Sequence, residues 1–185
     1  MRLPWVVAIT LCLVAVTGAT TAEETEVETP TSVSSTTGME GLTEVGVFVH
    51  VDTEMQSALS LRSSEVKTQV ELYLRKVPGL AVTDSIAGPI VSVGVEGLLG
   101  KHKDGSVAGF FSGHVIVELT QPALIARPPR VLSLDDASTW QSIRHGHGPA
   151  GSRGRNDVRD MVNRLLDEFQ NEYLKANPEV KPQAP

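Results

Sequence analysis

Three segments of the chain alternate apolar and other residues with a period of two, which is typical of a β-strand with one buried face. In the first segment, valines at positions 45, 47, 49 and 51 alternate with Gly46, Phe48 and His50. Residues 90–99 and 107–119 form the other two, and the turn between them centres on Asp104-Gly105. This spacing predicts an antiparallel hairpin. The alternation therefore predicts a sheet with a buried valine face and a mixed opposite face.

Two segments have the period of a helix with one apolar stripe. The first covers about residues 64–77, ends at Pro78-Gly79 and is followed by a short strand at 80–82. The second begins near a cap at Gly154 or Asn156 and continues to Asn177-Pro178. Residues 130–134 and 139–145 are predicted as two further short strands. The predicted fold class is α+β, an antiparallel sheet of about four to five strands with two helices packed on one face.

The N-terminal residues are typical of a secretory signal peptide. Arg2 is followed by an apolar run over residues 3–16 and by small residues up to Ala22. The alternative is a retained membrane anchor, but the run is shorter than the ~20 residues that span a bilayer. We therefore expect a signal peptide at 1–22, export to the periplasm or the extracellular space, and no membrane span after cleavage.

The rest of the chain divides by composition. Residues 23–42 are rich in Thr, Glu and Ser and are predicted to be a disordered linker. A single α+β domain is expected at 43–178, and a disordered tail at 179–185.

Charge and cysteine content exclude several function classes. The 16 Lys+Arg against 22 Asp+Glu argue against a general nucleic-acid binder, which needs excess positive charge. The one cysteine, Cys12, rules out a disulfide framework and a Cys-rich zinc site. Ser64 and Lys67 fit a Ser-x-x-Lys pattern, but its partner motifs are missing from the sequence. We therefore expect no enzyme activity, no cofactor and no metal site.

Several segments resemble a family of uncharacterised exported bacterial proteins. Val-Glu-Leu-Tyr-Leu-Arg at 70–75 and Pro-Gly-Leu-Ala-Val at 78–82 resemble the family's VELxLRxxGIxV segment. Residues 117–121, 138–140 and 169–178 match further segments in the same order, the last as FxNxYLxxNP. The layout is similar to that of envelope accessory proteins, such as lipopolysaccharide-assembly lipoproteins and transporter auxiliaries. The resemblance implies no activity, but it implies an envelope accessory module with an unknown envelope protein or component as partner.

The mixed face of the predicted sheet is a candidate partner surface. Aromatic and polar side chains are grouped there, as at protein interfaces. Its residues are Phe48, His50, Phe110, His114 and Ile116. Alternatively, residues 122–137 or a second protomer cover this face.

A second candidate site precedes the last helix, in a Gly-rich segment at 144–155 that is predicted to be a loop. Cations near a helix N-terminus bind phosphate, sulfate or a lipid headgroup. The candidate anion-binding residues are Arg144, His145, His147, Arg153 and Arg155. The alternative is a solvated loop without a ligand.

The histidines and glutamates also permit a third, enzymatic alternative. Glu96 and His114 are expected to be neighbours across the hairpin, and with Glu118 they could act as acid–base groups if a cleft joins them. His145 and His147 could hold a metal ion, but a stable site needs three or four ligands. The remaining candidates, among them His50, are remote in sequence, so the pattern predicts no metal site.

Overall fold

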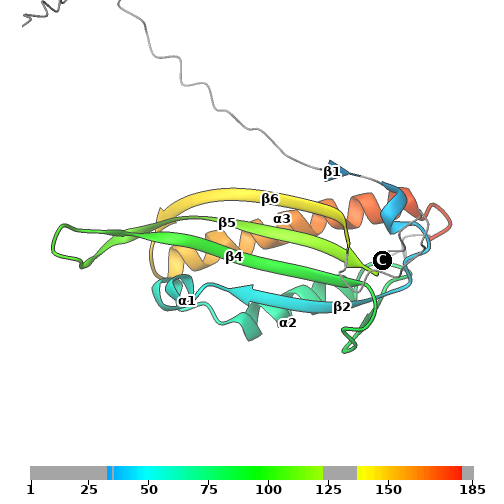
Figure 1. The fold of residues 1–185 in the computed structure, drawn as a ribbon, viewed down its shortest axis with the longest axis horizontal. Coiled ribbons are helices and arrows are strands. Elements are labelled where there is room, and N and C mark those ends of the chain that lie inside the picture. Colours follow the sequence, from blue (N-terminus) through cyan, green and yellow to red (C-terminus); the bar gives the residue numbers. More distant parts are fainter. Residues whose placement is uncertain (1–32, 35, 123–136, 181–185) are drawn as a thin grey trace, which may run out of the picture.

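The computed structural model describes residues 33–34, 36–122 and 137–180 (Figure 1). Within these ranges, the described residues form six strands, three α-helices and one short 3-10 helix. The strands are β1 (Val33–Ser34), β2 (Glu44–Val51), β3 (Ala81–Thr83), β4 (Ile90–Lys101), β5 (Val107–Gln121) and β6 (Ala137–Pro149). The helices are η1 (Thr36–Met39), α1 (Thr53–Leu59), α2 (Ser63–Leu74) and α3 (Ser152–Ala176).

All six strands belong to one sheet, in the order β1-β6-β5-β4-β2-β3. Strands β4, β5 and β6 are antiparallel, and the predicted hairpin is confirmed, with a positive φ of 83° at Gly105 in its turn. However, β2 is parallel to both β3 and β4. The prediction of a purely antiparallel sheet is therefore wrong. The helices between β2 and β3 return the chain to the end of the sheet where β2 began, and such a crossover makes the two strands parallel.

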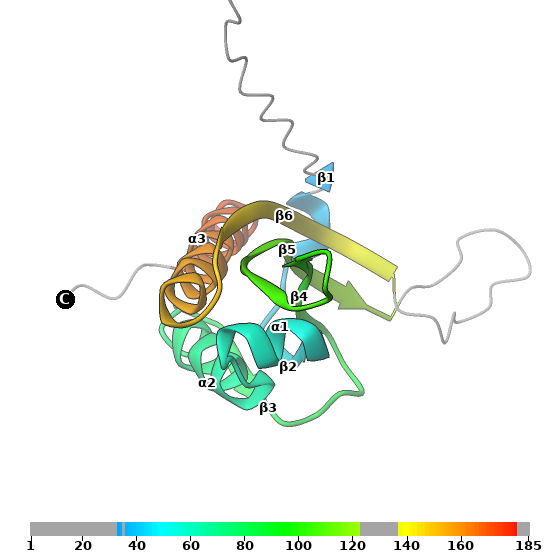
Figure 2. The ribbon, with the colours of Figure 1, turned by 90° about the vertical axis from the view of Figure 1, so that its left-hand side faces the viewer.

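The α+β class is confirmed, but three helices rather than two cover one face of the sheet (Figure 2). The sequence interpretation missed α1. Asp52 caps this helix by accepting a 3.0 Å hydrogen bond from the backbone N–H of Glu54. Met55 and Leu59, one turn apart, are buried against the sheet. The motif is a recognisable start signal followed by an apolar pair at i and i+4.

The core lies between the helices and the valine face of the sheet. The buried side chains of β4 and β5 alternate as predicted, and those of α3 form its predicted apolar stripe. Trp140 of β6 is 3% exposed and packs edge-on against Phe169 of α3, with ring centroids 5.4 Å apart.

The folded region extends beyond the predicted boundaries. Met39 is fully buried, although it falls within the segment 23–42 that was predicted to be a disordered linker. At the other end, Val180 lies against Gly79, within the predicted tail. The predicted signal peptide, most of the linker and the predicted strand at 130–134 lie outside the described residues. None of the helices in the described ranges is long and apolar enough to cross a membrane.

Candidate functional site: the open face of the sheet

One face of the sheet is not covered by any of the described helices; it is here called the open face and is formed by outward-pointing side chains of β2, β4, β5 and β6. Most of residues 122–137, the alternative cover considered for this face, lies outside the described residues. Because side chains alternate along a strand, residues that separate the buried valines lie on this face. It carries Phe48, Leu98 and Phe110, whose exposed fractions are 55%, 74% and 53%. The five predicted partner-surface residues all lie on this face: Phe48, His50, Phe110, His114 and Ile116.

The strand register arranges the open face in cross-strand rows. Beyond the row of Gly46 and Ile90, the successive rows contain Phe48 with Ser92, Glu118 and Gln141; His50 with Gly94, Ile116 and Ile143; Glu96 with His114 and His145; Leu98 with Ser112 and His147; and Phe110 with Pro149. Exposed apolar side chains thus lie at both ends of the face, and histidines lie between them.

Two glycines of β4 determine how the apolar side chains of β5 lie. A Cβ atom on Gly100 would sit 2.2 Å from the Cζ atom of Phe110, and one on Gly94 would sit 2.7 Å from Cγ2 of Ile116. The side chains of Phe110 and Ile116 therefore lie across β4, in space that a side chain at Gly100 or Gly94 would occupy. Contact with the strand restricts their rotamers before any partner binds.

The middle of the open face contains a row of titratable side chains from three strands. The Nε2 atom of His114 is 3.6 Å from an Oε atom of Glu96, as expected for neighbours across the hairpin. The ring centroids of His114 and His145 are 5.7 Å apart. His147 follows two residues later on β6, opposite Ser112. Three histidines that are up to 33 positions apart in sequence therefore meet at one place.

A shallow depression of about 460 Å³ lies beside these histidines. It is lined by Gly97, Leu98, Ser112, Gly113, His114, His145, Gly146 and His147. Neither Glu96 nor Glu118 lines it, and Glu118 is separated from His114 by Ile116 on the same face. The structure therefore does not bring the three proposed acid–base groups into one cleft.

The predicted anion-binding segment has a different structure from the expected loop. Residues 144–149 are the end of β6, and α3 begins at Ser152, before either of the expected caps. The prediction of a Gly-rich loop at 144–155 is therefore wrong. Residues 144–149 are held in the strand by antiparallel pairing with β5. The high glycine content indicated a loop, because it carries no information on this pairing.

The five candidate anion ligands are distributed over separate surfaces. Arg144 is on the helix side, where it donates to Glu168, which also accepts a 2.6 Å hydrogen bond from Ser142. His145 and His147 are on the open face, while Arg153 and Arg155 are in the first turn of α3. These residues do not form one cluster.

On the helix side, polar side chains join α2 to α3 around a depression of about 330 Å³. Gln69 donates a 2.7 Å hydrogen bond to Asn163 and accepts a 3.0 Å hydrogen bond from Arg159. The Tyr73 hydroxyl donates to Asp167; burial, followed by this contact, raises the pKa of Tyr73. These contacts hold two helices together and were not anticipated from the sequence, because each pairs residues about 90 or more positions apart.

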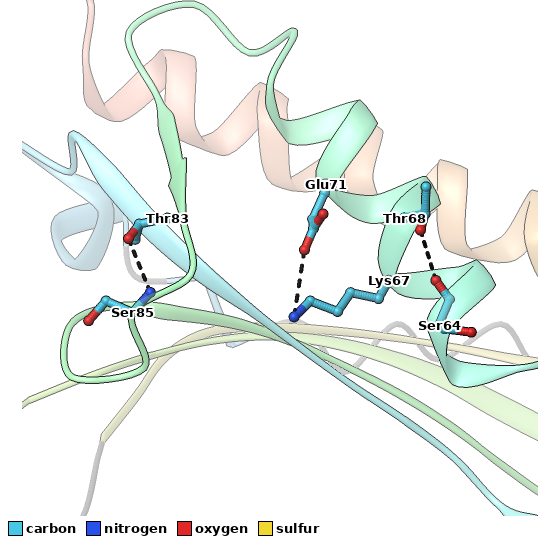
Figure 3. A network of polar contacts seen from close by, with 6 residues as sticks. All are labelled: Ser64, Lys67, Thr68, Glu71, Thr83 and Ser85. Carbon is cyan, nitrogen blue, oxygen red and sulfur yellow. Dashed lines mark hydrogen bonds and ion pairs between the residues drawn. The ribbon is translucent and has the colours of Figure 1, made fainter.

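The Ser-x-x-Lys residues lie on α2, shown in Figure 3. The ammonium group of Lys67 is 3.6 Å from a carboxylate oxygen of Glu71, one turn further along the helix. The backbone carbonyl of Ser64 accepts a 2.9 Å hydrogen bond from Thr68. A second contact in Figure 3 is local to the segment after β3, where the backbone N–H of Ser85 donates to Thr83 over 3.1 Å. Each of these contacts lies within a helix or a turn.

No protein-family model matches the chain, and no curated protein matches it. Three solved structures illustrate what its fold is similar to. A PelC dodecamer from Paraburkholderia phytofirmans is 17% identical with a TM-score of 0.40, covering 71% of this chain and 88% of that chain. The hypothetical protein CT253 from Chlamydia trachomatis is 12% identical with a TM-score of 0.44, covering 71% and 98%. The rare lipoprotein B from Shewanella oneidensis is 11% identical with a TM-score of 0.28, covering 72% and 94%. At these values the likenesses do not identify a family for this chain.

Proposed function

We propose that this chain is an exported, non-enzymatic envelope accessory domain that binds a partner protein through the open face. The observation that supports this proposal best is a sheet face that no described helix covers and that carries three large exposed apolar side chains, Phe48, Leu98 and Phe110. Exposed aromatic groups with a polar surround are typical of protein-binding surfaces. Export rests on the predicted signal peptide, and the accessory role rests on the resemblance of the sequence segments.

The chemistry of the open face suggests the kind of partner. Within the described strands, its fully charged side chains are carboxylates, those of Glu44, Glu96 and Glu118. Lys101 and Arg144 instead point to the helix side, where each pairs with a glutamate of a helix. A partner surface of apolar and basic side chains would therefore complement this face.

The proposal can be tested with photo-crosslinking amino acids placed at single positions in native cells. Phe48 and Phe110 lie near opposite ends of the open face, roughly 27 Å apart at the usual rise per strand residue. Leu72 on α2 is a matched control, since it is 57% exposed and lies on the helix side. We expect capture of the same protein from positions 48 and 110, and no capture of it from position 72.

A double variant, Phe48→Ser with Phe110→Ser, should then lose the partner in a pull-down, whereas Leu72→Ser should retain it. Thermal melting of each variant checks that the fold is intact. Capture only of a second copy of this chain would replace the partner proposal with self-association. Equal capture from position 72, or none from the open face, would contradict the proposal.

A further inference from the structure

A second feature of the open face is its histidine geometry. His145 and His147 are two residues apart on β6, so both point to the open face, and His114 of β5 is directly opposite His145. The Cβ atoms of same-face neighbours on a strand are about 6–7 Å apart, and the Cβ atoms of directly opposed residues on adjacent strands are about 4.5–5.5 Å apart. All three imidazoles can therefore reach one point between the two strands.

The observed ring separation suits a shared metal ion. A zinc ion binds histidine nitrogens at about 2.0–2.1 Å with tetrahedral angles, which places two ligand rings with centroids roughly 5 Å apart. The centroids of His114 and His145 are 5.7 Å apart. A small movement of these rings would bring two nitrogen ligands to a common ion.

A histidine that binds a metal usually donates a hydrogen bond from its other ring nitrogen to a carboxylate or a carbonyl, and Glu96 is placed to accept such a bond from His114. The carboxylate of Glu96 lies 3.6 Å from Nε2 of His114, which is an ion-pair distance, and a small closing movement would let it accept a hydrogen bond from that nitrogen. A carboxylate at one ring nitrogen fixes the tautomer and makes the other nitrogen a better metal ligand. In this arrangement Nδ1 of His114 is the nitrogen available to a metal.

Room for an ion and its water exists at the same place. The three histidines line the 460 Å³ depression on the open face. As the side chains stand, the described residues contain no group of three His, Cys, Asp or Glu arranged to hold a metal. Binding therefore requires the imidazoles to rotate, and His145 and His147 are exposed, so they can change rotamer without repacking the core.

We propose that His114, His145 and His147 bind one divalent transition-metal ion of the zinc, copper or nickel type, with Glu96 positioning His114. Imidazole ligands favour these metals over magnesium or calcium. Three protein ligands leave a fourth position for water or for a group from a bound partner. The site lies between the apolar ends of the open face but does not depend on the proposed partner binding.

Metal titration of the full chain tests the proposal. The protein is purified without a histidine tag and carries Cys12→Ser, so that neither a tag nor the thiol binds the probe. Isothermal titration with zinc chloride should show one ion per chain. Cobalt(II) should develop the strong visible absorption of a tetrahedral site, and zinc should then displace it.

Variants locate the ion. His145→Gln and His147→Gln should each weaken zinc binding at least tenfold, and Glu96→Gln should weaken it by about 10- to 100-fold if its role is positional. His50→Gln is the matched control, because His50 is also on the open face but belongs to the neighbouring row on β2, and it should leave zinc binding unchanged. The substituted histidines are exposed, so the melting temperatures should stay close to that of the parent protein.

A measurement on the parent protein tests the location of the metal site without any histidine substitution. Copper(II) should broaden the ring NMR signals of His114, His145 and His147 before those of His50. Absence of zinc binding in the micromolar range, retention of binding by a His145→Gln and His147→Gln double variant, or equal broadening of all histidines would overturn the proposal.

Discussion

Asn177 shows how one polar side chain joins distant parts of this chain. It is 2% exposed, and its amide nitrogen donates 2.9 Å hydrogen bonds to the carbonyls of Met39 and Tyr173. Its amide oxygen accepts a 2.8 Å hydrogen bond from the backbone N–H of Gly41. The sequence pattern predicted only that Asn177-Pro178 ends the last helix. The structure shows that the same residue also holds the segment after η1 in place.

Replacement of Asn177 by Ala should lower the free energy of unfolding by about 2–4 kcal/mol, because buried backbone groups lose their partners. Urea denaturation followed by circular dichroism measures the change. Asn171→Ala is the control, since Asn171 is exposed on the same helix, and its effect should stay within about 0.5 kcal/mol. Equal, small effects of both substitutions would show that the buried contacts add little to stability.

At the scale of elements, the start of α3 depends on a residue without a side chain. A Cβ atom on Gly154 would lie 2.1 Å from the carbonyl oxygen of Pro149 and 2.7 Å from the ring of Phe111. The first turn of α3 therefore packs against the end of β6 and against β5 more closely than an alanine allows. The absence of a Cβ atom at Gly154 therefore permits this close approach of α3 to the sheet.

Gly154→Ala should destabilise the protein by about 1–3 kcal/mol through overpacking. Helix propensity alone predicts the opposite sign, since Ala is better than Gly by roughly 1 kcal/mol within a helix. The sign of the change in urea denaturation therefore separates the two effects. Ser152→Ala, at an exposed position in the same turn, is the matched control and should have little effect.

At the scale of the whole molecule, the strand order determines which backbone hydrogen bonds of the sheet are best protected from hydrogen exchange. Strands β4 and β5 have long neighbours on both sides, whereas β3 is a three-residue edge strand and β1 has only two residues. A central strand opens only when much of the fold opens, but an edge strand can detach by itself.

Native-state hydrogen exchange rates should therefore differ between the central strands and the edge strand β3. Amides of the central strands, such as those of Val93 and Val117, should exchange only through global unfolding, and the amides of β3 should exchange at least about tenfold faster. Mass spectrometry or NMR measures both rates. Equal exchange rates in all strands would mean that β3 opens no more easily than the central strands β4 and β5.

The strength of each sequence prediction depended on how local its cause is. The hairpin at 90–119, the α3 stripe and the neighbouring positions of Glu96 and His114 follow from alternation and a turn, which involve residues close in sequence. The parallel placement of β2, the continuation of β6 beyond the predicted strand to Pro149 and the contacts of Asn177 depend on pairings between distant segments. No local pattern reports such pairings.

For the open face, the sequence by itself determined which side chains of each strand share a face, because the two-residue period is a property of the extended backbone. Only the tertiary structure decided which strands are neighbours. That order placed His145 opposite His114 and turned Arg144 toward Glu168 on α3. The face was therefore predictable and the histidine cluster was not, since strand register is set by the packing of the entire core.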